Sequence, residues 1–216
     1  MNDMHPDQQS PIAYVVDDDE SIRALWRWLM ESNGIAVRTF ATAAEFIESY
    51  RNGDAGCLVL DLKLPGMSGL ELQEYLNRKD IEIPIVFVTG HGDVPAAVSA
   101  IKGGAIDFIQ KPFSYRDVLS VIEKAFERDA KIREKRTRRS LIAGRLASLT
   151  DREREVLQRV IDGKQNKVIA RELDISVKTV EFHRAKMMEK AGVHSVAELV
   201  QIAMQTREPD RSRLDA

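Results

Sequence analysis

The chain has 216 residues, of which 44% are hydrophobic and 31% charged, proportions typical of a globular protein with one large or two small cores. The single cysteine, Cys57, excludes a disulfide framework, and together with only four scattered histidines it excludes a zinc cluster. Residues 1–11 are polar, and no apolar run approaches the roughly 20 residues that span a bilayer. We therefore expect a cytoplasmic protein that does not enter the membrane.

Charge is divided unevenly along the chain. Residues 1–126 carry 11 Lys/Arg and 19 Asp/Glu, whereas residues 127–216 carry 21 and 15, so the two net charges are −8 and +6. An acidic part followed by a basic part predicts two domains, the second of which meets a polyanion. The basic excess is concentrated in residues 127–145, which either contact phosphates or form a solvated helix and linker. Composition leaves both interpretations open.

The first part alternates strands with helices. Apolar runs rich in Val and Ile stand at 12–16, 36–40, 57–60, 85–88 and 105–109, and stretches with helical periodicity, such as 21–30, 69–76 and 94–101, lie between them. This order predicts a doubly wound, flavodoxin-like α/β domain over residues 11–127, with a five-stranded parallel sheet. In such sheets ligands bind beyond the carboxyl ends of the strands.

Polar side chains follow four of the predicted strands. They are Asp17, Asp18 and Asp19 after the first, Asp61 after the third, Thr89 after the fourth and Lys111 after the fifth. One sheet edge would therefore gather several carboxylates, a hydroxyl and an ammonium group, and clustered carboxylates are stable with a hard cation such as Mg²⁺. A carboxylate beside a metal and a lysine can attack phosphorus and form an aspartyl phosphate. Thr89 would then bind one phosphoryl oxygen.

Each of these residues also has an ordinary explanation by itself. An aspartate after a strand commonly caps the next helix, and we expect Asp19 or Glu20 to do so. A rival class with the same intermediate is the hydrolases that use a nucleophilic aspartate. Those enzymes carry a second acid two residues after the nucleophile, where this chain has Lys63. The four strand ends taken together favour the phosphoryl site.

Four segments carry a resemblance: VVDDD at 15–19, LDLKLPGMSGLEL at 60–72, VTGHGDVPAAV at 88–98 and DFIQKPF at 107–113. They resemble the receiver domain of two-component response regulators of the NarL/FixJ family. The resemblance implies that a sensor histidine kinase phosphorylates Asp61. The implied Mg²⁺ ligands are Asp17, mainly through water, Asp18, Asp61 and the main-chain carbonyl of Lys63. The implied switch and phosphate-binding residues are Thr89, Phe108 and Lys111, with a cis bond between Lys111 and Pro112.

The second part reads as a small all-α domain over residues 146–206. Thr150 and Glu153 form the pattern of a capping box that opens a helix to about residue 161. Further helices are expected at 166–173, at 177–191 after the cap Ser176, and at 196–205. The tight turn at 174–176 joins two of them into a helix-turn-helix, whose second helix enters the major groove of DNA.

Helical periodicity assigns the faces of this reading helix. Val177, Val180, Met187 and Ala191 are expected to face inward. Phe182 points outward, where thymine methyl groups would cover it, and Glu181 could accept a hydrogen bond from a cytosine amino group. The candidates for phosphate contact are Lys178, Thr179, His183, Arg184 and Lys186.

Residues 149–193 resemble the four-helix DNA-binding domain of the LuxR family, in which Asn166 and Lys167 match positions near the DNA backbone. The two resemblances imply a transcription factor rather than an enzyme. Once phosphorylated by its kinase it would form a homodimer, bind promoter DNA and act with RNA polymerase. The rival interpretation is a regulator that acts through protein contacts without DNA.

The segments outside the two domains carry weaker patterns. Residues 128–145 are expected to form a basic, helical linker, because residues 113–143 contain no Pro or Gly and a helix starting near residue 114 can continue to about residue 139. Whether this linker is rigid or flexible is left open. Residues 1–10 and 207–216 are expected to be disordered.

Overall fold

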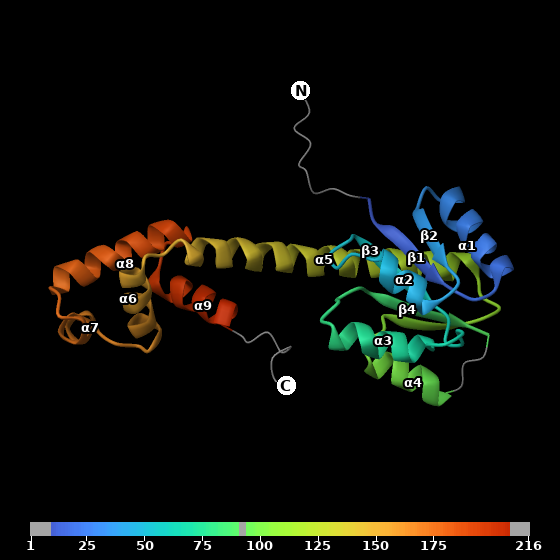
Figure 1. Cartoon of the computed structure of the whole chain (residues 1–216). Helices are drawn as coiled ribbons and strands as arrows, with labels where there is room; N and C mark the ends of the chain where they lie inside the picture. The colour runs from blue at the N-terminus through green and yellow to red at the C-terminus, as the bar shows by residue number, and fades with distance from the viewer. Residues whose placement is uncertain (1–9, 91–93, 208–216) are drawn as a thin grey trace, which may run out of the picture. The chain divides into compact units, whose positions relative to one another are not determined.

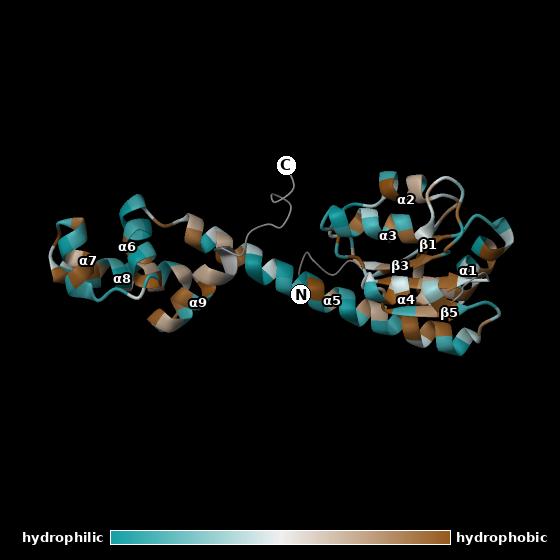
Figure 2. Cartoon of the chain, turned by 90° about the horizontal axis from the view of Figure 1, so that it is seen from below, coloured by the Kyte–Doolittle hydropathy of each residue, from teal (hydrophilic) through white to brown (hydrophobic). Residues whose placement is uncertain are grey.

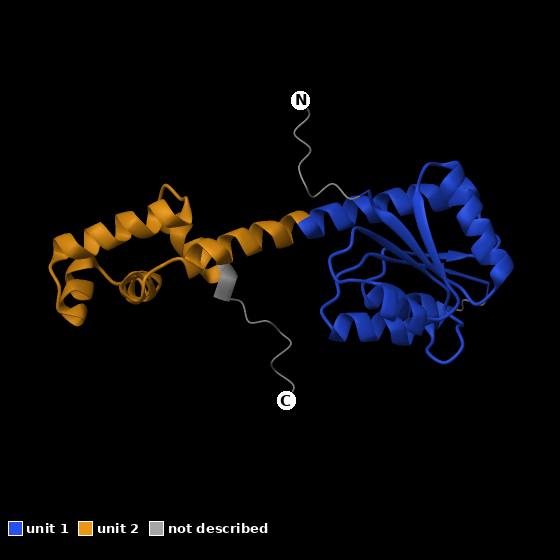
Figure 3. Cartoon of the chain, turned by 45° about the horizontal axis from the view of Figure 1, so that its top comes forward, with its two compact units in different colours: residues 1–133 blue, residues 134–216 orange. Residues whose placement is uncertain are grey.

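The computed structural model describes residues 10–90 and 94–207, the last three without their side chains. The predicted disordered ends lie outside these ranges, apart from positions 10 and 207. The chain divides into two compact units, residues 1–133 and 134–216, and the boundary falls inside helix α5 (Tyr115–Ala147; Figure 3). This boundary lies within the predicted linker, residues 128–145.

The first unit is a parallel sheet with helices on both faces (Figure 1). Its elements are β1 (Ile12–Val16), α1 (Glu20–Ser32), β2 (Ala36–Phe40), α2 (Ala43–Ser49), β3 (Gly56–Leu60), α3 (Gly69–Arg78), β4 (Ile85–Thr89), α4 (Val94–Lys102), β5 (Asp107–Gln110) and the first part of α5. The strand order is β2-β1-β3-β4-β5, and all neighbouring strands are parallel. The predicted five-stranded doubly wound fold is therefore confirmed.

Alternate residues of the central strands enter two different cores. Tyr14, Leu58 and Phe87 pack on one face with residues of α2, α3 and α4. Val15 and Val59 pack on the opposite face with residues of α1 and α5. Because β1, β3 and β4 are covered on both sides, they read as uninterrupted apolar runs. Their carboxyl ends meet at one edge, where the polar residues after each strand are brought together.

The second unit is all-α, as predicted. It contains the last part of α5, α6 (Asp151–Ile161), α7 (Asn166–Leu173), α8 (Val177–Ala191) and α9 (Val196–Arg207). Thr150 and Glu153 form the predicted capping box, and Ser176 caps α8 by accepting from the N–H of Thr179. Gly192 ends α8 with a left-handed φ of 68°, a conformation that glycine adopts at no steric cost.

Helix α5 is longer than the sequence pattern predicts. It continues to Ala147 instead of ending near residue 139. Ile142 is buried, and Leu146 packs against the core of the second unit, so tertiary contacts stabilise the added turns. The middle of α5 is hydrophilic (Figure 2), in agreement with its basic composition. Within the described residues, no helix has both the length and the apolar character needed to cross a membrane.

Candidate functional site

Three carboxylates meet at the carboxyl edge of the sheet. Asp17 follows β1 and Asp61 follows β3, and the pairing of these strands sets Val16 beside Leu60. The N–H of Asp61 donates to the carbonyl of Val16 at 3.0 Å. As a result, one carboxylate oxygen each of Asp17, Asp18 and Asp61 lies within 4.8 Å of the others. Asp17 is buried, Asp61 is half-buried and Asp18 is exposed.

Lys111 bridges two of these carboxylates. Its Nζ donates to Asp17 Oδ2 at 2.6 Å and to Asp61 Oδ2 at 3.0 Å. Its main-chain N–H donates to the carbonyl of Thr89 at 2.8 Å, and its bond to Pro112 is cis, as the family resemblance implied. The lysine is therefore held between the ends of β1, β3 and β4.

Burial and charge act in opposite directions on the ionisation of this site. Burial disfavours the charge on Lys111, but the hydrogen bonds to the two carboxylates outweigh it and raise the pKa of Lys111. Burial also raises the pKa of Asp17, although the hydrogen bond from Lys111 counteracts part of this rise. The ammonium group thus stays charged near neutral pH and offsets the repulsion between the carboxylates.

The third successive aspartate has a different role. Asp19 caps α1, accepting from the main-chain N–H of Ser21 at 2.8 Å and of Ile22 at 3.4 Å. The capping interpretation considered for these aspartates is therefore confirmed for Asp19. Asp17 and Asp18 are the two that belong to the carboxylate cluster.

Thr89 and Phe108 project from the same face of the sheet. Phe108 on β5 is in register with Phe87 on β4, and the centroids of their rings lie 6.2 Å apart. Thr89 is two residues beyond Phe87, so alternation places its side chain on that face as well. Thr89 is fully buried, whereas Phe108 is half-buried. The other oxygen of Asp61, Oδ1, accepts from the main-chain N–H of Lys63 at 3.2 Å.

In the second unit, α8 presents an exposed face that includes a large aromatic side chain. Phe182 is 58% exposed, and Lys178 and Glu181 are exposed as well. Of the residues predicted to face inward, Val180, Met187 and Ala191 are buried. The inward prediction for Val177 is wrong, because that residue is 36% exposed. It lies in the first turn of α8, at the end of the buried stripe.

Several candidates for phosphate contact have partners within the protein. Arg184 Nη1 donates to Asn166 Oδ1 at 2.5 Å, so these two predicted DNA contacts join α8 to α7. Lys186 forms an ion pair with Glu189 at 2.7 Å on the exposed surface. The Thr179 and Ser176 hydroxyl oxygens lie 2.8 Å apart at the start of α8. The remaining three candidates are Lys167 and Lys178, which are exposed, and His183, whose ring packs beside Phe182 with centroids 5.8 Å apart.

Sequence reasoning did not find the contacts that hold the C-terminal end of α8. Lys190 Nζ donates to the buried Glu153 at 2.7 Å, and Arg145 Nη1 donates to the carbonyl of Ala191 at 3.1 Å. The sequence predicted that Glu153 forms a capping box with Thr150, but the second partner of Glu153, Lys190, is 37 residues away in the chain. No local pattern connects residues at such a separation.

Both units match known families. Residues 13–123 match the family model described as response regulator receiver domain, and residues 147–203 match that of bacterial regulatory proteins of the luxR family. The chain belongs to the NarL/FixJ-type response regulators. It is therefore a phosphorylation-dependent transcriptional regulator, with a receiver domain in the first unit and a LuxR-type DNA-binding domain in the second. The family is not that of the hydrolases considered as rivals.

Full-length relatives share both parts of this response regulator. The transcriptional regulatory protein FixJ of Azorhizobium caulinodans is 41% identical over 191 residues, covering 88% of this chain and 90% of FixJ. The response regulator protein TmoT of Ectopseudomonas mendocina is 41% identical over 198 residues, covering 92% and 90%. The solved structure of the response regulator StyR matches with a TM-score of 0.77 at 45% identity, covering 91% of this chain and all of StyR.

Proposed function

We propose that Asp61 is the residue that accepts the phosphoryl group, in a reaction that requires Mg²⁺. The observation that carries this proposal is the bridge from Lys111 Nζ to Asp17 and Asp61, at 2.6 and 3.0 Å, within a cluster of three carboxylates. A phosphoryl donor would approach the exposed side of this cluster, where Asp18 lies. The donor in the cell is a sensor histidine kinase.

The residues present fit a magnesium ion. Asp17, Asp18 and Asp61 supply oxygen atoms close enough to share one cation, and the main-chain carbonyl of Lys63 would add another. Bound Mg²⁺ would supply positive charge that offsets the repulsion between these carboxylates and a phosphoryl group. The Asp61 carboxylate attacks phosphorus while the bond from phosphorus to the kinase histidine breaks. The Lys111 ammonium then pairs with the transferred phosphoryl oxygens.

Thr89 and Phe108 would form a switch that connects Asp61 to the surface formed by α4 and β5. Thr89 would bind a phosphoryl oxygen, and Phe108 would turn inward into the space that Thr89 leaves. Val94, Val98 and Ile101 are exposed apolar residues on α4, and gathered exposed apolar side chains are typical of interaction surfaces. Repacking of this surface would promote the homodimer.

The dimer then binds promoter DNA through two copies of α8. Phe182 and Glu181 would contact base edges, and the exposed Lys167 and Lys178 would contact phosphates. Two reading helices would engage half-sites about one turn of DNA apart, so that affinity rises because two weak contacts are linked. At the promoter the bound dimer would act on RNA polymerase.

Labelling with acetyl phosphate tests the acceptor. The full chain should gain one phosphoryl group in the presence of Mg²⁺, seen as a mass increase, and should lose it on treatment with alkali. Asp61→Asn should abolish the labelling, because an amide is a poor nucleophile and carries no charge for the metal. Retention of alkali-labile phosphate by Asp61→Asn would place the acceptor elsewhere.

A further inference from the structure

Helix α4 has few apolar contacts with the rest of its unit. Ala100 is buried and Ala96 packs partly buried against the same core, whereas Val94, Val98 and Ile101 are 76%, 45% and 49% exposed. Burial of two small side chains, one of them partial, contributes little hydrophobic stabilisation. The position of α4 therefore depends strongly on the polar contacts at its ends.

The C-terminal end of α4 is closed by its own backbone. The N–H of Ala105 donates to the carbonyl of Ala100 at 3.1 Å, and the N–H of Gly104 donates to the carbonyl of Ile101 at 3.0 Å. Gly104 has a left-handed φ of 96°. Together these features form a Schellman motif, which ends the helix and satisfies two of its last carbonyls.

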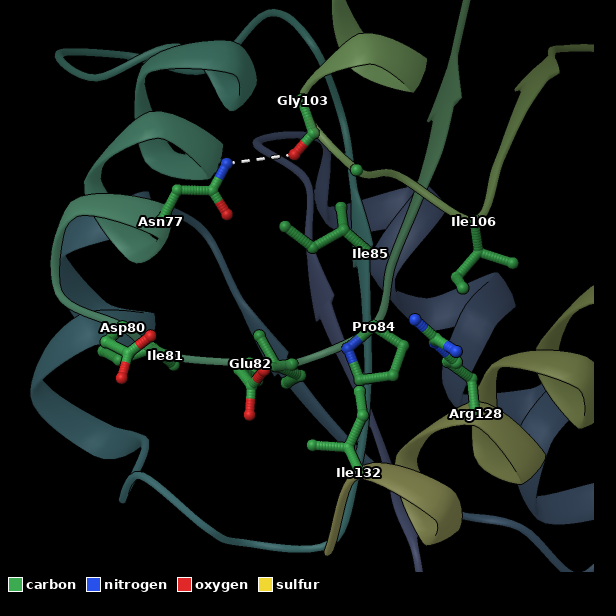
Figure 4. A pocket seen from close by; sticks show the side chains of 12 residues that line it. Asn77, Asp80, Ile81, Glu82, Pro84, Ile85, Gly103, Ile106, Arg128 and Ile132 are labelled. Carbon is green, nitrogen blue, oxygen red and sulfur yellow. Dashed lines mark hydrogen bonds between the residues drawn. The ribbon is translucent and has the colours of Figure 1, made fainter. Parts of the chain in front are cut away.

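Two side-chain amides of α3 hold this same end. The Nε2 of Gln73, which is 3% exposed, donates to the carbonyl of Ala100 at 3.0 Å. One turn later, Asn77 Nδ2 donates to the carbonyl of Gly103 at 3.0 Å (Figure 4). A buried glutamine is uncommon unless its amide is hydrogen-bonded, so Gln73 is specifically placed for this contact. We refer to Gln73 and Asn77 as the α3 clamp.

Gly103 leaves room for the clamp. A Cβ atom at position 103 would lie 2.6 Å from Gln73 Oε1, which is too close for a real contact. On another side, the turn at Gly103 and Gly104 borders a cavity of about 270 Å³ that is also lined by Arg128 and Ile132 (Figure 4). The turn is thus held tightly on the α3 side and faces open volume toward α5.

We propose that the α3 clamp fixes the C-terminal end of α4 while the end that follows Thr89 moves on phosphorylation. Gln73 and Asn77 are then positioning residues, and α4 pivots near Gly103 and Gly104. A displacement at Thr89 would then rotate α4 about this pivot and change the direction in which the side chains of Val94 and Val98 point. This inference rests on the proposed function, because it assigns the mechanical basis of the proposed switch.

Loss of the α3 clamp should reduce the difference in the position of α4 between the unphosphorylated and the phosphorylated protein. Without it, α4 would shift in the unphosphorylated protein as well, and phosphorylation would orient it less completely. Gln73→Met keeps the size of the side chain but removes both the donor and the acceptor. Asn77→Ala removes the exposed half of the clamp and is the variant less prone to misfold. Glu74→Gln alters the neighbouring exposed residue and serves as the matched control.

The first readout is the dimer dissociation constant, measured by sedimentation before and after labelling with acetyl phosphate. Labelling of Asp61 should be unchanged in all three variants. The ratio of the two dissociation constants should fall about tenfold in Gln73→Met, by a smaller factor in Asn77→Ala and not in Glu74→Gln. A merely structural role would lower the melting temperature of Gln73→Met and leave the ratio as in the wild type, and that result overturns the proposal.

The second readout is amide hydrogen exchange at protein concentrations where the chain is monomeric. In the wild type, labelling should change exchange at residues 94–98 and leave 100–105 unaltered, whereas in Gln73→Met both segments should change. Equal changes at both ends of wild-type α4 would contradict the pivot. This readout does not depend on the dimer: a wild type that labels but stays monomeric refutes the proposed dimer switch, and the exchange pattern still decides the role of the clamp.

Discussion

At the residue scale, Lys111 carries the two contacts that order the carboxylate cluster. Its side chain is 18% exposed and that of Asp17 only 3%, so the Asp17 charge is largely withdrawn from water and paired with Lys111. Lys111→Met should lower the free energy of unfolding at pH 7 by about 2–4 kcal/mol without Mg²⁺, because a buried carboxylate loses its partner. Saturating Mg²⁺ should restore part of this loss. Urea unfolding with and without Mg²⁺ measures both values, and an equal loss under the two conditions would contradict a shared cation site.

Substitution of Asp18 should have little effect on stability and a large effect on the Mg²⁺ requirement. Its side chain is exposed and forms part of the carboxylate cluster. Asp18→Asn should therefore change the free energy of unfolding by less than about 0.5 kcal/mol. The Mg²⁺ concentration needed for half-maximal labelling by acetyl phosphate should rise at least about tenfold, since one anionic ligand is lost. An unchanged Mg²⁺ requirement would remove Asp18 from the metal site.

Substitution of Phe182 tests sequence reading separately from general DNA affinity. Because the ring is 58% exposed, Phe182→Ala should leave the stability of the second unit nearly unchanged. A specific duplex can be selected from a random pool with the phosphorylated wild type. The Phe182→Ala variant should bind this duplex more weakly by about 1–3 kcal/mol, and its affinity for a scrambled duplex should change little. Lys178→Ala is the control, because loss of a phosphate contact should weaken both duplexes alike. Equal losses for Phe182→Ala on the two duplexes would argue against base contact. Fluorescence anisotropy measures these affinities.

At the element scale, Glu153 joins the start of α6 to the end of α8. Burial alone would raise the pKa of Glu153, but the hydrogen bonds from Lys190 and Thr150 outweigh it and hold the pKa below its ordinary value. A carboxyl group with a lowered folded-state pKa stabilises the fold above its unfolded pKa, near 4.3, and that stability is lost as pH falls through the lower folded value. Glu153→Gln should therefore cost about 2 kcal/mol at pH 7 and much less at about pH 3. Thermal unfolding of residues 134–216 across this pH range tests the prediction, and a cost independent of pH would exclude the ion pair as its cause.

The helices and strands themselves were largely predictable because their signals are local. The capping box at Thr150, the cap at Ser176 and the stop at Gly192 each involve residues within one or two turns. The end of α5 was not predictable, because burial of Ile142 and partial burial of Leu146 extend the helix beyond residue 139. Pairing of Arg184 with Asn166 was equally hidden, since helical periodicity says which face a residue lies on and not which neighbour it meets.

At the scale of the whole molecule, the order of strands was sufficient to gather the acidic cluster. Parallel strands bring their carboxyl ends to one edge, so residues as distant as Asp17, Asp61 and Lys111 could be grouped before any contact was known. The α3 clamp could not be found in this way. Gln73 and Ala100 lie in the middle of one helix and near the end of another, 27 residues apart, and neither belongs to a motif.

The division into two units predicts how the parts behave when separated. Residues 134–216 alone should bind the selected duplex weakly, and treatment with acetyl phosphate should not change their affinity because they lack Asp61. The full chain should bind it tightly only after labelling, since two reading helices then act together. Gel shifts at several salt concentrations measure both proteins. Affinity of the isolated unit equal to that of the labelled full chain would instead indicate that the receiver masks α8 until it is phosphorylated.

Phosphorylation of Asp61 is proposed to convert this response regulator from a monomer into a dimer. Sedimentation equilibrium of the full chain, with Mg²⁺ and with or without acetyl phosphate, tests it most directly. The wild type should change from monomer to dimer in proportion to the fraction labelled, and Asp61→Asn should remain a monomer under the same conditions. A wild type that stays monomeric after complete labelling, or an Asp61→Asn variant that dimerises with acetyl phosphate, would contradict the account.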